Sequence, residues 1–420
     1  MASLEYIDFK PWREVIEGGQ VTLQPDKLGR RIERLPQIFW ADGEGWAEAN
    51  HWSLEKAATP GVDIETVKTV MKHLYPYAHH LEREGLDWRH FPMRLAERAI
   101  VRFRGEIMSQ IADGSLQSST ASSRMNAVIQ FYRHANAYDF VSPESPMWRE
   151  KSVVIPYYDS VGFKRSLSRV TTDLTIRNTA RPGLRLEDGL LPLSEAHMSA
   201  LLEFSSRRST QELHLMLTTG FFTGARLETI TSLRIENLER ANPDPYMKGF
   251  FLIRVGPGSG VATKFDVQGE LLVPEFLLAE LKHYAYSVER LKRESKTNAS
   301  DKSLLFLTVR GSRYSGNSVS RLMTDLRRMA IRAGLRFMNR FKFHQTRATF
   351  GTWLMKLALS ATTVSAAIEF VRNAMLHKNE ATTFKYVRFL ENNKGKQESA
   401  KAFNEAFTGL RDRAWDRFDA

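Results

Sequence analysis

Residues 343–388 constrain the fold of this chain more than any other stretch, because its two ends carry the side chains with recognisable chemistry. His344 and Arg347 are three residues apart, which places both on one face of a helix. His377 precedes Tyr386 by nine residues, and Val-Arg follows the tyrosine directly. A fold that joins the two ends would hold a phosphodiester among cations with a phenol beside it. We therefore expect a helical phosphate-binding site.

A further arginine lies upstream, where Thr223-Gly224-Ala225-Arg226 places it after a Thr-Gly turn. Taken in order, Thr-Gly-x-Arg, His-x-x-Arg and the nine-residue step to the tyrosine resemble the tyrosine recombinases, also called the phage integrase family. The resemblance covers residues 190–391 and, more weakly, a helical stretch before them. It implies a mainly α fold, in which a helical core-binding domain precedes an α+β catalytic domain with a small antiparallel sheet.

The first half of the chain has the periodicity of helices. Apolar residues from Ile64 to Leu81 recur at steps of three and four, and Gly85 follows where a helix commonly ends. Two more helices are expected, from about Pro92 to Met108 and from Thr120 to about Tyr138. This block is similar in pattern to the core-binding domain of the resembling family.

The second half mixes helices with short strands. Ser194 is expected to cap a helix that runs through Leu202. The segments 250–255, 261–265 and 271–274 have β-strand character and are separated by turns that contain glycine. They predict a small three-stranded antiparallel sheet.

The chain is expected to divide into five parts. Residues 1–45 form an N-terminal extension, which is either an arm that touches DNA or a solvated lead-in to the first domain. A helical DNA-binding domain at 46–145, a basic linker at 146–188 and a catalytic domain at 189–392 follow. Residues 393–420 form an amphipathic C-terminal helix, which packs either on its own domain or into a neighbouring subunit.

The amino-acid composition limits the kinds of molecule that the protein is expected to bind. Lys and Arg number 60 against 48 Asp and Glu, and a net charge of +12 favours a polyanion, although charge alone does not separate DNA from RNA or from an anionic membrane surface. There is no cysteine, which excludes disulfides, thiolate metal sites and cysteine nucleophiles. No run approaches the roughly 18 apolar residues of a membrane span, and none follows Met1 as a leader would. We expect a protein of the bacterial cytoplasm that joins the nucleoid when it is on DNA.

Tyr386 is the expected nucleophile, although a single helical tyrosine is more often a core residue. A phenol has a pKa near 10, so attack at neutral pH requires a base or a dense positive field. The resemblance assigns His344 to the proton of the phenol and His377 to a hydrogen bond with a phosphate oxygen. It assigns Arg226 and Arg347 to the non-bridging phosphate oxygens, where a planar guanidinium donates two parallel hydrogen bonds.

Lys264 completes the expected catalytic set, on a strand of the predicted hairpin. The resemblance makes it the general acid that protonates the departing 5′-oxygen, whereas its residue type alone indicates an ordinary strand lysine. The resemblance implies no metal, and it implies no ATP because one phosphodiester replaces another.

Eight further residues are candidate contacts to double-stranded DNA outside the catalytic site. Three arginines spaced by four would line one helix face, a serine and an arginine lie near the start of the helix from Thr120, and three cations lie in the linker. A solvated surface is the alternative for the arginine stripe, which it explains better when the stripe is taken alone, and for the linker, where DNA contact is favoured. The candidates are Arg94, Arg98, Arg102, Ser122, Arg124, Lys164, Arg165 and Arg169.

The expected function is site-specific recombination or integration of duplex DNA through a 3′-phosphotyrosyl intermediate, with strand exchange in a tetramer that moves a mobile element. An accessory DNA-bending or directionality protein would be a further partner. The alternatives are a type IB topoisomerase or a telomere resolvase, which would use similar groups, and a DNA-binding protein without catalytic activity.

Overall fold

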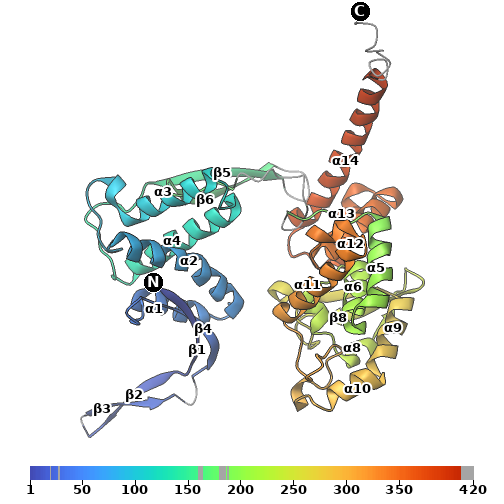
Figure 1. Ribbon diagram of the computed structural model, residues 1–420, viewed down its shortest axis with the longest axis horizontal. Helices are drawn as coiled ribbons and strands as arrows, with labels where there is room; N and C mark the ends of the chain where they lie inside the picture. The colour runs from blue at the N-terminus through green and yellow to red at the C-terminus, as the bar shows by residue number, and fades with distance from the viewer. Residues whose placement is uncertain (19, 27–28, 159–163, 179–185, 187–188, 408–420) are drawn as a thin grey trace, which may run out of the picture. The chain divides into compact units, whose positions relative to one another are not determined.

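The computed structural model describes residues 1–18, 20–26, 29–158, 164–178, 186 and 189–407. The chain divides into two compact units, Met1–Ala180 and Arg181–Ala420, each with a hydrophobic core of its own. Helices dominate and the sheets are small and antiparallel (Figure 1), which confirms the mainly α fold expected from the sequence. In the part of the chain that is described, no helix is both long and apolar enough to cross a bilayer.

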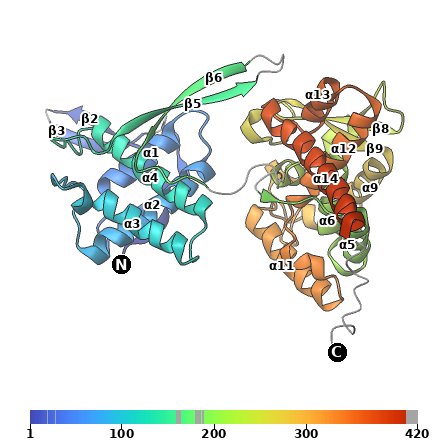
Figure 2. The same cartoon turned by 90° about the horizontal axis from the view of Figure 1, so that it is seen from above.

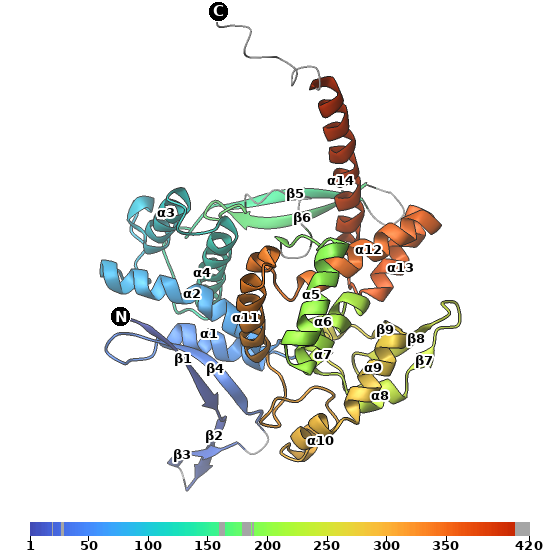
Figure 3. The ribbon, with the colours of Figure 1, turned by 45° about the vertical axis from the view of Figure 1, so that its right-hand side comes forward.

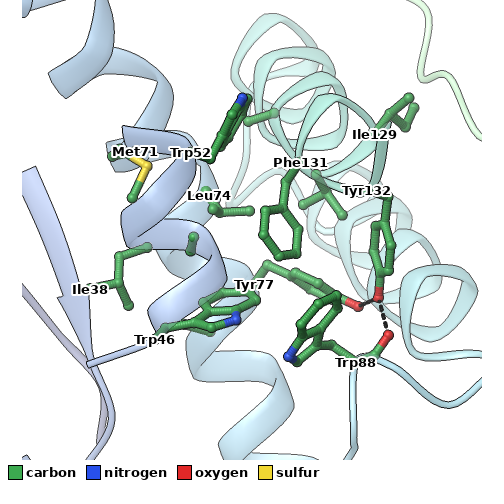
Figure 4. Packing of buried hydrophobic residues seen from close by; sticks show 14 of the residues in the cluster. Ile38, Trp46, Trp52, Met71, Leu74, Tyr77, Trp88, Ile129, Phe131 and Tyr132 are labelled. Atoms are coloured by element: carbon green, nitrogen blue, oxygen red, sulfur yellow. Dashed lines mark hydrogen bonds between the residues drawn. The ribbon is translucent and has the colours of Figure 1, made fainter. Parts of the chain in front are cut away.

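The helices of the first unit enclose an aromatic core. The ring of Trp46 lies 4.8 Å from that of Phe131, and the hydroxyl groups of Tyr77 and Tyr132 are 2.6 Å apart (Figure 4). The second helix ends at Gly85, which has a left-handed φ of 62°, as its sequence predicts. The helices are α1 (Ala47–Ala58), α2 (Ile64–Glu84), α3 (Ala99–Ala112) and α4 (Ser118–Ala137).

The N-terminal segment is part of this unit and contains four strands. One strand buries Ile32, Leu35 and Ile38 in the core that α1 and α2 share, so the segment is more than a solvated lead-in. The buried positions of that strand do not alternate with exposed ones, and the other strands are largely exposed, which explains why the sequence does not reveal them. The strands are β1 (Ser3–Phe9), β2 (Trp12–Glu17), β3 (Gln20–Pro25) and β4 (Ile32–Phe39), in the antiparallel pairs β1–β4 and β2–β3.

The segment expected to be a linker contains a long β-hairpin. Strands β5 (Glu150–Tyr158) and β6 (Lys164–Thr172) pair antiparallel along nine residues each. Figure 2 shows them as a two-stranded ribbon. The prolines and serines that indicated a linker are compatible with this hairpin because a two-stranded ribbon has only edge strands, where proline is tolerated.

The helix expected from Pro92 to Met108 is shorter at its N-terminal end. A 3₁₀ turn occupies Leu95–Glu97, and α3 begins only at Ala99. The expected stripe of Arg94, Arg98 and Arg102 on one helix face is therefore not formed.

The second unit is built around a helical core. Ser194 caps its first helix, as predicted, by accepting a hydrogen bond of 3.3 Å from the backbone N–H of His197. Helices α5, α6 and α12 lie side by side (Figure 3). The helices are α5 (Glu195–Arg208), α6 (Gln211–Thr223), α7 (Leu227–Thr231), α8 (Ile235–Glu239), α9 (Glu275–Ala285), α10 (Val288–Glu294), α11 (Gly316–Arg332), α12 (Gln345–Ala361), α13 (Val364–Ala374) and α14 (Glu380–Phe407).

The sheet of the second unit has three strands, but one of them differs from the prediction. The strands follow the order β7 (Asn242–Pro243), β8 (Phe250–Val255) and β9 (Gly269–Pro274). The expected strand at 261–265 is absent from this sheet, because only Val261 forms an isolated bridge, to Gly256. A 3₁₀ turn at Lys264–Asp266 follows.

Helix α14 carries both Tyr386 and the start of the stretch expected to be a separate C-terminal helix. It is continuous from Glu380 to Phe407, so no boundary falls near residue 393. The amphipathic character predicted for residues 393–420 depends on apolar side chains between residues 400 and 418, which lie outside the side chains that the structure describes.

Candidate active site

Arg347 is the residue around which the candidate site is assembled. It lies in the first turn of α12, and its side chain is 2 % exposed. Its Nη1 donates to the carbonyl oxygen of Gly224 at 2.5 Å, and its Nη2 donates to that of Met375 at 2.6 Å. The planar guanidinium thus joins two turns that are far apart in sequence, one just before Arg226 and one just before His377.

The turn that carries Arg226 is fixed by a glycine. Gly224 ends α6 with a left-handed φ of 65°, and a Cβ atom there would collide with the ring of Phe350 on α12. Arg226 follows as the N-cap residue of α7 and is half-buried. The Thr-Gly-x-Arg pattern therefore forms a tight turn packed on the helix of Arg347.

His344 lies on the same end of α12 as Arg347. It occupies the N-cap position, three residues before the arginine, and is half-buried. The sequence spacing and the observed geometry agree, because both residues belong to the first turn of this helix.

His377 and Tyr386 are in contact. Their rings are 6.1 Å apart with an angle of 26° between the planes. His377 is 6 % exposed, and its Nδ1 lies 2.8 Å from the hydroxyl oxygen of Thr383. The residue before it, Leu376, has a φ of 51°, so the turn between α13 and α14 contains a non-glycine residue in the left-handed region.

Tyr386 is completely buried in this structure, with 0 % of its surface exposed. It packs with Met375 and Ala348, and a Cβ atom on Gly351 would lie 2.6 Å from its Cε1. A phosphate can reach the phenol only after part of the covering structure moves. The geometry is therefore that of an assembled but closed site.

Lys264 lies in the β8–β9 connection and is exposed. Its Nζ is 5.2 Å from the centre of the Phe265 ring, and Nζ of Lys378 is 5.7 Å from the same ring. Since Lys378 follows His377 directly, the lysine turn lies beside the histidine turn. The expected strand position for Lys264 is wrong, but the structure does bring the residue to the same site.

The contacts of Arg347, His377 and Phe265 thus connect the turns and helix ends that carry all six expected catalytic residues within the second unit. The stretch 342–388, which carries four of the six, is basic, with seven Lys or Arg and only Glu369 and Glu380 as acids. Such a site is suited to the charge that gathers on a phosphate during substitution at phosphorus. In the described ranges, no group of three or more His, Asp or Glu side chains is placed to hold a metal ion.

A cavity of about 610 Å³ adjoins the site. It lies between the sheet and α13, and His377 and Leu376 form one wall. Arg254, Glu270 and Arg372 are also among its lining residues, so charged side chains share the lining with apolar ones such as Leu252 and Phe370.

The candidate DNA contacts of the first unit are less uniform than expected. Arg98 is 2 % exposed and donates to the carbonyl oxygens of Pro92 and Pro146 and to the hydroxyl of Ser145. It connects loops within the protein, and the expectation of a DNA contact is corrected for this residue. Arg94 and Arg102 are exposed.

The remaining candidates lie on α4 and β6. Ser122 and Arg124 are half-buried in the first turns of α4. Lys164, Arg165 and Arg169 lie on strand β6, and their side chains are outside the described part of the structure.

Sequence reasoning missed four residues that shape the site: Gly351, Phe265, Lys378 and Thr383. The two consecutive threonines before the tyrosine were a visible signal for Thr383. The other three have no local pattern, because their importance depends on contacts between distant segments.

Comparison with known proteins places this geometry in a family. Residues 192–393 match the model described as the phage integrase family. Among curated protein sequences, none matches the chain at a significant level.

Several solved structures are similar to the chain at low identity. One is the Tn1549 transposon integrase (residues 82–397) in complex with transposon right-end DNA, at 14 % identity, 81 % of this chain, 94 % of that chain and a TM-score of 0.48. XerA recombinase has 16 % identity, coverage of 87 % and 98 %, and a TM-score of 0.33. A lambda integrase (residues 75–356) dimer bound to a COC′ core site has 12 % identity, coverage of 81 % and 94 %, and a TM-score of 0.47. Residues 192–393 thus form a domain of the phage integrase family, and the protein is a tyrosine recombinase.

Proposed function

We propose that the protein cuts and rejoins duplex DNA with Tyr386 as the nucleophile. The phenolic oxygen attacks the scissile phosphorus, a 3′-phosphotyrosyl bond forms and the bond from phosphorus to the 5′-oxygen breaks. His344 accepts the phenolic proton, and Lys264 gives a proton to the departing 5′-oxygen. Arg226, Arg347 and His377 bind the non-bridging oxygens as negative charge develops on them.

The second half of the reaction reverses the first with a different strand. A 5′-hydroxyl from a partner duplex attacks the phosphotyrosine and releases Tyr386. One phosphodiester bond replaces another, so the sequence of steps requires no external source of energy. We further propose that exchange takes place in a tetramer through a Holliday junction and that it moves a mobile element in a bacterial cell.

One observation carries this proposal above the others. Arg347 bonds to Gly224 and Met375, and this ties the turn of Arg226 and the turn of His377 to the helix of His344. His377 then lies against Tyr386. DNA binding alone does not require basic residues from distant positions in the chain to be held next to a buried tyrosine.

Covalent capture on DNA of randomised sequence tests the proposal. The probe is a library of nicked duplexes, in which the released fragment diffuses away and leaves the protein attached. We expect the wild-type protein to form an adduct that resists denaturation and the Tyr386→Phe variant to form none. Equal capture of both proteins would show that another residue is the nucleophile, and no capture of either would favour a DNA-binding protein without catalytic activity.

The selected sites then separate the catalytic alternatives. Two plasmid-borne copies of a captured site should recombine, as seen by exchange of flanking markers. Relaxation of supercoiled plasmid without exchange would favour a type IB topoisomerase, and hairpin ends would favour a telomere resolvase.

A further inference from the structure

Thr383 makes a buried hydrogen bond to one of the proposed catalytic residues. Its side chain is 0 % exposed, and its hydroxyl oxygen lies 2.8 Å from Nδ1 of His377. It lies in the first turn of α14, three residues before Tyr386, on the same helix. No part of the proposed reaction so far uses this residue.

The bond decides how His377 presents its other ring nitrogen. If the threonine O–H donates to Nδ1, a neutral imidazole carries its proton on Nε2 and can donate it to a phosphate oxygen. If Nδ1 is instead left without this donor, the tautomer with the proton on Nδ1 becomes available, and its Nε2 is an acceptor that repels the phosphate oxygen. The hydroxyl therefore selects between a productive and an unproductive form of the ring.

We propose that Thr383 is a positioning residue that holds His377 as an Nε2–H donor and fixes the direction of its ring. The inference rests on the proposed function, because it assigns to His377 a hydrogen bond with the scissile phosphate. It extends that function because Thr383, in the first turn of the helix that carries Tyr386, would control the tautomer of His377.

The bond is local, which matters because the site is closed. His377 lies three residues before Glu380, where α14 begins, and Thr383 lies in the first turn of that helix. A movement of α14 that uncovers Tyr386 would carry Thr383 with it, and only two residues separate His377 from the start of that helix. A hydrogen bond that holds during this movement keeps the orientation of His377 coupled to the position of Tyr386.

Substitution of Thr383 by valine or by serine distinguishes the contribution of its hydroxyl group from that of its packing. Thr383→Val keeps the branched shape and removes the hydroxyl, whereas Thr383→Ser keeps the hydroxyl and removes a methyl group. Thr382→Val is a matched control in the same helical turn, because Thr382 is only half-buried and has no assigned role. Circular dichroism and thermal unfolding of each variant establish that it is folded.

The first readout is the tautomer of His377, measured by long-range ¹H–¹⁵N correlation spectra of the full chain labelled at histidine and assigned with His377→Ala. We expect Nε2 protonation in the wild type, Thr383→Ser and Thr382→Val, and a mixture of tautomers in Thr383→Val. An unchanged tautomer in Thr383→Val overturns the proposal. This readout needs no catalysis, so it stands apart from any failure of Tyr386 as the nucleophile.

The second readout is the single-turnover rate of covalent attachment to a captured nicked duplex. We expect Thr383→Val to lower the rate about tenfold, which is the scale of one lost hydrogen bond, and Thr383→Ser to restore it to within about threefold of the wild type. In a His377→Ala background, Thr383→Val should have no further effect, because the residue acts through the histidine. Independent, multiplicative losses in the double variant would show that Thr383 serves only packing.

Discussion

Nη1 of Arg347 lies 2.5 Å from the carbonyl oxygen of Gly224, although the two residues are 123 positions apart in the chain. The carbonyl belongs to the end of α6, and the guanidinium belongs to the start of α12. A buried guanidinium is stable only where its N–H groups meet acceptors, so this contact fixes the distance between the two helices and the direction of the arginine together. The proposed phosphate ligand is therefore also a connector of the fold.

Replacement of Arg347 by lysine tests that double role. A lysine ammonium lacks the planar fork and is not expected to reach the carbonyls of both Gly224 and Met375. We expect Arg347→Lys to lose about 1–3 kcal/mol of folding free energy and to cleave DNA at least about 100-fold more slowly. Chemical denaturation and single-turnover cleavage measure the two effects, with Arg207→Lys on the exposed part of α5 as the control. Wild-type stability in Arg347→Lys would contradict the connecting role.

The helical part of the fold was predictable because its signals are local. Gly85 and Gly224 end helices α2 and α6 with left-handed φ angles, and Ser194 caps α5, and each of these residues acts on its own neighbours in sequence. Two pairs of the catalytic set were recognisable for the same reason. His344 and Arg347 share a helical turn, and the step from His377 to Tyr386 spans one turn and the start of one helix.

The remaining features depend on partners that are distant in sequence. Arg98 has the spacing of a surface arginine, but its side chain is buried on the carbonyl oxygens of Pro92 and Pro146. Lys264 lies in a segment with strand-like composition, yet Phe265 and Asp266 both have φ angles above 50° and form a turn. Strand-like composition does not guarantee a strand to pair with, and β8 instead pairs directly with β9 on one side and with the two-residue β7 on the other.

Gly351 provides a test of the packing around the nucleophile. A Cβ atom there would lie 2.5 Å from Sδ of Met375 and 2.6 Å from Cε1 of Tyr386. Overpacking of this kind costs about 1–3 kcal/mol, so we expect Gly351→Ala to lower the thermal stability and to displace the tyrosine, with slower covalent attachment. Gly395→Ala on α14 is the matched control, because nothing lies within 4 Å of its added methyl group. The control should be stabilised by about 0.5–1 kcal/mol, and a Gly351→Ala variant as stable and active as the wild type would refute the packing argument.

Lys264 can be tested by changing the leaving group. A 5′-bridging sulfur leaves as a thiolate and needs no proton, whereas an oxygen does. We expect Lys264→Ala to attach slowly to ordinary DNA and to recover most of the wild-type rate on the sulfur-containing duplex. Phe265→Leu should show the same pattern more weakly, since the ring lies 5.2 Å from the lysine Nζ and helps to hold it. A defect of equal size on both duplexes would mean that Lys264 does not act as the general acid.

The pair formed by His51 and His134 predicts a pH dependence of stability in the first unit. Nδ1 of His134 is 2.9 Å from a carboxylate oxygen of Glu55, and Nδ1 of His51 is 3.1 Å from Nε2 of His134. With Nδ1 facing the carboxylate as the N–H, Nε2 must accept from His51, and a proton on Nε2 would place two donors against each other. Burial lowers the pKa of His134, with repulsion from His51 and Lys56 in the same direction and Glu55 opposing them.

The lowered pKa of His134 determines how the stability of the first unit changes with pH. A histidine whose folded pKa is below its unfolded value of about 6.5 binds more protons when unfolded, so stability is complete above about pH 6.5 and declines as the pH falls through the lower folded pKa. Tryptophan fluorescence reports this unit, because six of the eight tryptophans precede residue 150. We expect its unfolding temperature to fall between about pH 7 and pH 5, and to fall less steeply in His134→Gln. His90→Gln, at an exposed position, should keep the wild-type slope, and a slope unaltered in His134→Gln would rule out this pair as the source.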